Sequence, residues 1–108
     1  MRSTAYEPNE VEFQSAVVDY ARIKGWRCAH FRPARIMRNG QISWRTPVSA
    51  DGQGFVDLVL ARNGKILFWE CKSNNGKVSA EQQLWLDALP GARVIRPRDW
   101  PEIERALE

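Results

Sequence analysis

Apolar residues near the N-terminus recur at the spacing of one helix face. They are Val11, Phe13, Val17, Val18, Tyr20 and Ala21, and Gly25 follows them. Asn9 and Glu12 have the three-residue spacing of a capping box, and a glycine commonly follows the last turn of a helix. The pattern predicts a helix over residues 10–24.

A short apolar-rich run, residues 26–31, ends at Arg32-Pro33. Proline cannot donate to a central ladder, so it suits the end of a strand. From 34 to 53 the alternation breaks down around Asn39-Gly40, Thr46-Pro47 and Asp51-Gly52. We expect a long basic loop or an irregular hairpin there, and loops of such length in compact domains are usually functional.

Two β-rich runs, residues 55–61 and 65–71, are separated by Arg62-Asn63-Gly64. Asn-Gly between such runs is the strongest short-range hairpin signal. Ser79 and Gln82 then form a second capping box, which opens a helix that ends at Pro90-Gly91. A short strand is predicted over 93–96, and a last helix runs from Asp99 to the C-terminus.

The predicted elements follow the order helix, three strands, helix, strand, helix (αβββαβα). The third strand, its helix and the fourth strand are typical of a βαβ unit, whose two strands are parallel. A chain of 108 residues has room for one domain, residues 1–108. We expect an α/β fold with a mixed central sheet flanked by helices on both faces.

The Asn-Gly turn determines which residues face each other across the predicted hairpin. Counting outward from it brings Asp57 opposite Glu70 in a non-hydrogen-bonded pair, where Cβ atoms lie about 4.5 to 5.5 Å apart. Lys72 shares the face of Glu70, because side chains alternate along a strand. Two like charges this close, on otherwise apolar strands, need a compensating cation.

Two carboxylates and an otherwise open site suit Mg²⁺ or Mn²⁺. Such a metal lowers the pKa of bound water and neutralises a phosphate, and the Lys72 ammonium adds positive charge to the transition state. The alternative is an ordinary hairpin whose end carries a surface ion pair. Glu-x-Lys alone is common, but the facing Asp57, the register and the shared face together favour a catalytic site.

Basic residues cluster in one part of the chain, although the formal net charge is only +3. Residues 20–50, here called the basic segment, contain no acid and seven cations: Arg22, Lys24, Arg27, Arg32, Arg35, Arg38 and Arg45. Because arginine favours bidentate phosphate contacts, the segment predicts a polyanionic partner such as DNA. A solvated face that keeps the protein in solution is the alternative.

No apolar stretch approaches the roughly 20 residues that span a bilayer, and the N-terminus is polar. Cys28 and Cys71 are far apart and lack the CxxC spacing of zinc sites. We expect a soluble cytoplasmic protein with reduced thiols. Five Trp, four Phe and two Tyr exceed the needs of a small core, so some rings are expected to face a ligand or partner, although Trp85 is expected in the core.

Five segments carry a resemblance to a known family. They are His30-Phe31-Arg32-Pro33-Ala34-Arg35, Asp51-Gly52-Gln53-Gly54-Phe55-Val56-Asp57-Leu58-Val59, Trp69-Glu70-Cys71-Lys72, Ser79-Ala80-Glu81-Gln82-Gln83-Leu84-Trp85 and Arg96-Pro97-Arg98-Asp99-Trp100. With them the chain resembles the PD-(D/E)XK nuclease superfamily, and more closely its VRR-NUC (virus-type replication-repair nuclease) family. The resemblance implies a single-domain restriction-endonuclease-like fold.

The resemblance also implies roles for individual residues. A metal is held by Asp57, Glu70 and the main-chain carbonyl of Cys71, with Lys72 as the catalytic lysine. The chain departs from the pattern at Val56, where a proline usually precedes the aspartate, and at Cys71 between the glutamate and the lysine. Proline serves geometry rather than chemistry at that point, so we still expect activity.

A carboxylate that many relatives carry in the first helix corresponds to Gln14 here. On helical spacing Gln14 shares a stripe with Val11, Val18 and Ala21, so it is expected to point at the sheet. Glu10, one turn earlier, is the alternative.

Supporting residues are expected around this centre. Gln82 resembles a motif glutamine that helps to hold the site, although its capping box is a sufficient explanation. His30 is either a structural histidine or a group near the scissile phosphate, and Lys77 either touches a phosphate or solvates its loop. The candidates for DNA contact are Gln14, His30, Arg32, Arg35 and Lys77.

These features predict a metal-dependent, structure-selective DNA endonuclease of a bacterial or phage-infected cell. The first hypothesis is a homodimer that resolves four-way (Holliday) junctions, because two symmetric cuts need two active sites. A nickase, flap nuclease or end-dependent nuclease is the second, and a non-catalytic DNA-binding module is the third. With little surface left for reading base edges, recognition of DNA shape and phosphates is expected.

Overall fold

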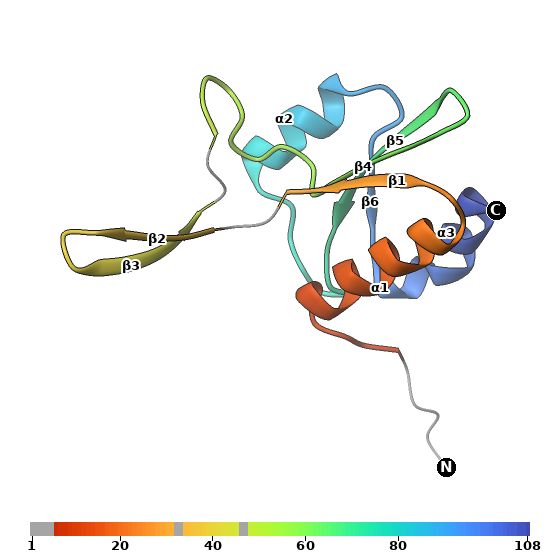
Figure 1. Cartoon of the computed structure of the whole chain (residues 1–108), viewed down its shortest axis with the longest axis horizontal. Helices are drawn as coiled ribbons and strands as arrows, with labels where there is room; N and C mark the ends of the chain where they lie inside the picture. Colours follow the sequence, from red (N-terminus) through yellow and green to blue (C-terminus); the bar gives the residue numbers. More distant parts are fainter. Residues whose placement is uncertain (1–5, 32–33, 46–47) are drawn as a thin grey trace, which may run out of the picture.

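A computed structural model describes residues 6–31, 34–45 and 48–108, and only the main chain of residues 34–36 and 45. Arg32 and the side chain of Arg35 therefore lie outside the described part. The elements are α1 (Glu10–Ile23), β1 (Arg27–His30), β2 (Ala34–Arg38), β3 (Gln41–Arg45), β4 (Leu58–Arg62), β5 (Lys65–Cys71), α2 (Ala80–Ala88), β6 (Arg93–Ile95), the short 3-10 helix η1 (Pro97–Asp99) and α3 (Trp100–Leu107) (Figure 1).

Both predicted capping boxes are present and begin their helices. At α1, the Glu12 N–H donates to Asn9 Oδ1 at 2.8 Å, and the Asn9 N–H donates to Glu12 Oε1 at 3.0 Å. At α2, Ser79 and Gln82 make the same reciprocal pair. Each box satisfies two of the main-chain donors that a helix start leaves free.

The predicted hairpin forms with the register expected from its turn. β4 and β5 pair antiparallel from Arg62 opposite Lys65 to Leu58 opposite Trp69. Asn63 and Gly64 both have positive φ, as the tight turn between twisted strands requires. β6 then joins β5 in parallel, and β1 joins β4 antiparallel, so the four-stranded sheet has the order β1-β4-β5-β6 and is mixed as predicted.

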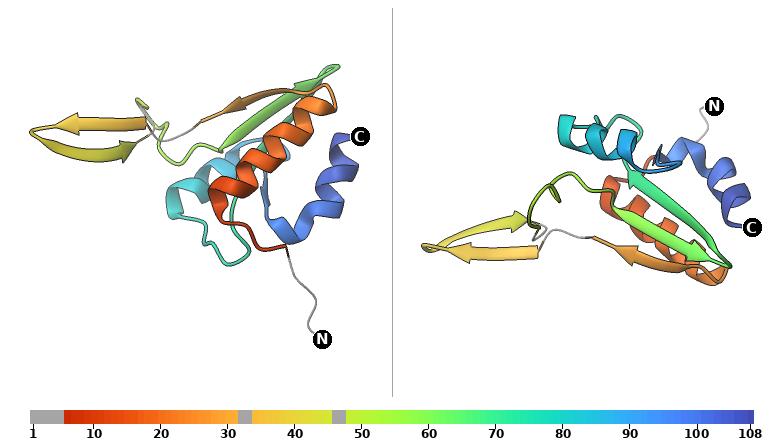
Figure 2. Two further views of the ribbon diagram at one scale, coloured as in Figure 1. Left: turned by 60° about the horizontal axis from the view of Figure 1, so that its bottom comes forward. Right: turned by 90° about the horizontal axis from the view of Figure 1, so that it is seen from above.

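The buried core lies on one face of this sheet. Its members are Phe13, Val17 and Ala21 of α1; Trp26, which precedes β1; Leu58 and Leu60 of β4; Trp69 and Cys71 of β5; Ile95 of β6; and Ile103 and Leu107 of α3. Glu70 stands between two of these residues on β5, so its side chain points to the opposite face. There it accepts a hydrogen bond from Gln82 of α2. Helices therefore flank the sheet on both faces, with α2 alone on the side of Glu70 (Figures 1 and 2).

The stretch 34–45 is a regular hairpin, which corrects the predicted order αβββαβα by adding two strands. β2 and β3 pair from Ala34 opposite Arg45 to Arg38 opposite Gln41 as a separate two-stranded sheet. Asn39 and Gly40 form its turn with positive φ. This hairpin, here called the arm, projects away from the body of the molecule (Figures 1 and 2). Its residues Met37, Ile42 and Trp44 are exposed to solvent, so burial in a core does not impose on them the alternation by which strands are recognised.

One further boundary differs from the sequence expectation. β4 begins at Leu58 rather than at residue 55, because turns at Gly52 and the positive φ of Gly54 shape a loop that ends only at Asp57. The last helix begins as expected, with Asp99 as its N-cap and Trp100 as its first residue, after the 3-10 turn η1. Across the described ranges, none of the helices combines the length and apolar character needed to cross a bilayer.

Candidate metal centre

Asp57 stands where β4 and β5 begin to separate. Its main-chain carbonyl accepts the Phe31 N–H at 2.9 Å, which continues the pairing with β1. On the other side, its Oδ2 accepts the Cys71 N–H at 2.9 Å. The carboxylate thus accepts the Cys71 N–H of β5, which lies beyond the last main-chain pair of β4 and β5. The ladder of β4 with β5 ends at Leu58 opposite Trp69, so Asp57 lies one residue before the strand and the expected pairing of Asp57 with Glu70 falls just beyond the ladder.

Glu70 is a buried acid, with only 1% of its surface exposed. Its Oε2 accepts from Gln82 Nε2 at 3.0 Å and lies 3.7 Å from Lys72 Nζ. Its Oε1 is buried and has no hydrogen-bond donor within the described part of the chain. Buried polar atoms are normally satisfied, so an oxygen of this kind needs either a proton or a cation.

The environment of Glu70 favours its protonated form in the absence of a cation. Burial, the negative charge of Asp57 and a hydrogen bond with the Asp57 side chain raise the pKa of Glu70 to about 8, against the opposing effect of Lys72. As an acid, Glu70 can share its proton with Asp57. As a carboxylate, it leaves Oε1 unsatisfied. A divalent cation placed between the two acids would meet the same need as that proton.

Lys72 completes the group from the end of β5. Its main-chain N–H donates to the Ile95 carbonyl at 3.0 Å, so β6 holds its main chain. The residue is only 8% exposed, and its ammonium forms an ion pair with Glu70 when that acid is deprotonated. A buried lysine beside two acids carries positive charge into a site that otherwise gathers negative charge.

The two candidates on α1 have different neighbours. Gln14 points at the sheet, as predicted, and its Oε1 lies 3.0 Å from His30 Nε2. Glu10 is half-buried, and burial raises its pKa, which Lys72 lowers and Asp57 raises further. Glu10 therefore lies within electrostatic range of Lys72 and Asp57, whereas Gln14 contacts His30.

Gln82 has both roles that its position suggested. Its Oε1 accepts the Ser79 N–H at 2.8 Å in the capping box, and its Nε2 donates to Glu70. Lys77 is exposed in the loop between β5 and α2. Arg32 and Arg35, the two arginines expected at DNA, cannot be placed at the site because their side chains lie outside the described part.

One positioning residue was not expected from the sequence. Arg96 follows β6, and its Nη1 donates to the main-chain carbonyls of Ser73 and Gly76, both at 2.7 Å. These bonds hold the turn that comes directly after Lys72. An arginine before a proline carries no sequence signal for this role.

Trp85 differs from the sequence expectation. It is half-buried and lies outside the core, with its ring edge-on to Phe55 at 4.9 Å between centroids. Its Nε1 donates to the Asp51 carbonyl at 2.9 Å. It therefore holds the loop before Asp57 against α2 instead of filling the core.

The residues present fit a hard divalent cation only if main-chain oxygen and water contribute ligands. Within the described ranges, no group of three or more His, Cys, Asp or Glu side chains is arranged to hold a metal. Main-chain N–H and C=O of one strand residue point to the same neighbour, so the Cys71 carbonyl is directed to the edge where its N–H meets Asp57. Two carboxylates and a carbonyl, completed by water, suit Mg²⁺ or Mn²⁺.

The burial of Cys71 raises the pKa of its thiol, so its side chain is a neutral core group and only its main chain is available to a metal.

Comparisons with protein-family models, with curated proteins and with solved structures find no match. The assignment of function therefore depends on the geometry of these side chains.

Proposed function

We propose that this protein is a Mg²⁺- or Mn²⁺-dependent endonuclease that hydrolyses phosphodiester bonds of DNA, as its resemblance to VRR-NUC nucleases implies. The observation that supports this most is the state of Glu70. A buried acid beside Asp57, with an unsatisfied oxygen and a lysine two residues along, is costly to a fold and useful to phosphate chemistry.

Each residue of the candidate metal centre has a distinct part in the proposed reaction. When bound, the metal activates water and neutralises charge on the phosphate. Asp57, Glu70 and the Cys71 carbonyl would hold it. Gln82 fixes the orientation of Glu70 through its hydrogen bond. Lys72 places an ammonium where negative charge develops on the phosphate oxygens.

The basic segment supports DNA as the substrate. Arg22, Lys24 and Arg27 are exposed at the end of α1 and the start of β1, and Arg38 is exposed on the arm. Exposed arginine and lysine side chains bind DNA phosphates with little dependence on base sequence. We therefore propose recognition of DNA shape.

Four-way junctions are the substrate that we favour, cut by a homodimer in the cytoplasm of a bacterial or phage-infected cell. A single site cuts one strand, and a twofold dimer supplies the second, symmetric cut. Nicked duplexes, flaps and DNA ends are the competing substrates.

The test is cleavage of labelled four-way junctions, flaps, splayed arms and linear duplexes, with Mg²⁺ or Mn²⁺ and with chelator. We expect metal-dependent cutting that is fastest on the four-way junction. Lys72→Met should lower the cleavage rate by about a hundredfold or more, whereas Lys65→Met, at the exposed turn of the same hairpin, should leave it unchanged. DNA binding without cleavage under any of these conditions would leave only the binding-module hypothesis.

A further inference from the structure

The arm carries an apolar face that is exposed in the described part of the chain. Met37 lies opposite Ile42 in register, and Trp44 follows two residues later, so the three side chains share one face. They are 61%, 54% and 67% exposed, respectively. A two-stranded hairpin is only marginally stable alone in water. The arm therefore gains from a partner surface on this face.

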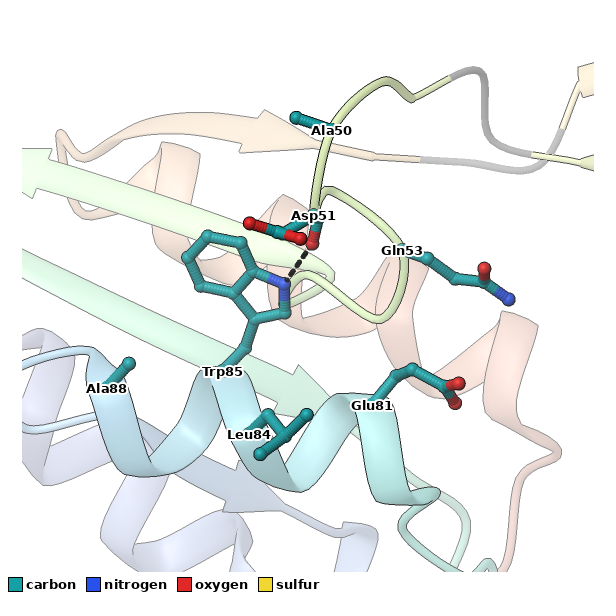
Figure 3. A pocket seen from close by; sticks show the side chains of 7 residues that line it. All are labelled: Ala50, Asp51, Gln53, Glu81, Leu84, Trp85 and Ala88. Atoms are coloured by element: carbon teal, nitrogen blue, oxygen red, sulfur yellow. Dashed lines mark hydrogen bonds between the residues drawn. The ribbon is translucent and has the colours of Figure 1, made fainter.

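A pocket of about 440 Å³ lies beside the base of the arm, between the loop after β3 and α2. Figure 3 shows its lining: Ala50, Asp51, Gln53, Glu81, Leu84, Trp85 and Ala88. Leu84 is 69% exposed, and no residue of α2 is fully buried. The pocket thus joins an apolar floor to acidic groups at its rim.

Charge makes the two surfaces complementary. The basic segment, which includes the arm, contains no acidic residue, and Arg35 lies opposite Trp44 in register, on the same face of the arm. The helix α2 contains Glu81 and Asp87 and no lysine or arginine, and Asp51 faces it across the pocket. An acidic rim repels DNA and attracts a cationic arm.

We propose that the arm of one chain docks on this pocket of a second copy, and that the exchange is reciprocal. The arm points away from its own pocket (Figure 1), so the same chain does not fill it. A twofold axis lets each chain give one arm and receive one, which doubles the contact from a single pair of surfaces. Trp44 is the natural anchor, because large rings seated in pockets dominate interface energies.

The consequence for the site follows from Glu81. This residue lines the pocket and immediately precedes Gln82, the donor to Glu70. An arm seated there would lie against the first turn of α2 and bring the partner's cations near the metal centre. This inference rests on the homodimer of the proposed function and names its interface.

The test uses metal-free protein without DNA, so it is independent of whether the protein is a nuclease. Light scattering of the wild type at micromolar concentration should give about twice the chain mass of 12.4 kDa. Trp44→Ser on the arm and Leu84→Arg at the pocket should each weaken dimerisation by about tenfold or more. Ile66→Ser, an exposed apolar position on the β4-β5 hairpin, should have no effect, and thermal melts confirm that each variant folds.

A mixture of the two variants gives a stricter test. The intact arm of the Leu84→Arg chain can still enter the intact pocket of the Trp44→Ser chain. Because the two residues act in one contact, their losses do not add, and the mixture should dimerise more tightly than either variant alone.

Three results would overturn the inference. A monomeric wild type at 100-fold higher concentration would do so, as would a dimer that Leu84→Arg leaves intact, since the arms would then pack on each other. The third is a Trp44→Ser protein that dimerises normally but loses DNA binding, which would assign the arm's apolar face to DNA.

Discussion

Gln82 of α2 donates from Nε2 to Glu70 Oε2 at 3.0 Å, while its Oε1 accepts the Ser79 N–H at the start of the same helix. One side chain therefore begins α2 and orients the buried acid of β5. Because α2 has no fully buried residue of its own, this bond and the bond from Trp85 to the loop before Asp57 help to attach it to the sheet. The candidate metal centre and the placement of α2 therefore depend on each other.

Removing either central carboxylate should separate binding from cleavage. Asp57→Asn and Glu70→Gln each remove a ligand charge while keeping the shape of the side chain, so we expect cleavage to fall by at least about a hundredfold with DNA affinity nearly unchanged. Metal affinity, measured by calorimetry, should fall in parallel. Asp19→Asn, an exposed acid on α1, serves as the matched control. Near wild-type cutting by either variant would show that the metal is held elsewhere.

The pKa of Glu70 predicts how stability depends on pH. It is raised from 4.5 to about 8 in the folded protein, so its contribution is fully present below about pH 4.5 and is lost as pH rises to about 8. Without metal, the free energy of unfolding should fall over this range. Glu70→Gln should flatten that part of the profile. At pH 8 its free energy of unfolding should be about 1–3 kcal/mol higher than that of the wild type.

Magnesium should reverse this trend. The metal binds the deprotonated acids, so its affinity should rise with pH and its binding should release protons, which calorimetry in buffers of different ionisation enthalpy detects. Equal stabilisation by Mg²⁺ at pH 5.5 and pH 8 would contradict a site that contains Glu70.

The elements that the sequence predicted well are those with local chemical signals. Asn9 with Glu12 and Ser79 with Gln82 are caps that require no distant partner, and the Asn63-Gly64 turn sets the register of β4 and β5 by itself. The arm was harder to predict. Met37, Ile42 and Trp44 are exposed, so burial does not impose on this face the alternation that identifies a strand, and Asn39-Gly40 marked the turn.

The same distinction holds for the candidate site. Asp57, Glu70 and Lys72 could be placed together by counting along one hairpin. The choice between Glu10 and Gln14 depended on how α1 lies across the sheet, which a one-dimensional pattern does not contain. Arg96 reaches back to the Ser73–Gly76 turn from a strand 20 residues further on, and such a contact has no local signal.

The basic segment should bind phosphates without reading sequence. Arg32→Ala and Arg35→Ala should each weaken binding to all DNA sequences alike and reduce the slope of log affinity against log salt by about one unit. Arg93→Ala, an exposed arginine on β6 outside the segment, should leave the slope unchanged. Fluorescence anisotropy across a salt series measures both quantities. Wild-type slopes in both arginine variants would place these residues away from DNA.

Gly54 couples the loop before Asp57 to the first turn of α2. A Cβ at this position would lie 2.6 Å from Glu81 Cβ, 2.7 Å from the Glu81 carbonyl carbon and 2.8 Å from the Gln82 nitrogen. Its φ of +81° also disfavours any side chain. Because main chain cannot yield as a flexible side chain can, Gly54→Ala should push α2 away from the sheet. The hydrogen bond from Gln82 to Glu70 should then lengthen or break.

We therefore expect Gly54→Ala to lower the free energy of unfolding by about 1–3 kcal/mol and to weaken metal binding as well. Gly64 is the matched control, because it has the same φ of +81° with nothing within 4 Å of the added carbon. Gly64→Ala should lower the free energy of unfolding only by the backbone strain that it introduces, about 1 kcal/mol, and should retain metal affinity. Adding Gln82→Ala to Gly54→Ala should cause little further loss of metal affinity, because both changes act on the same bond. Independent, additive losses in that double mutant would show that Gly54 does not support the site through Gln82.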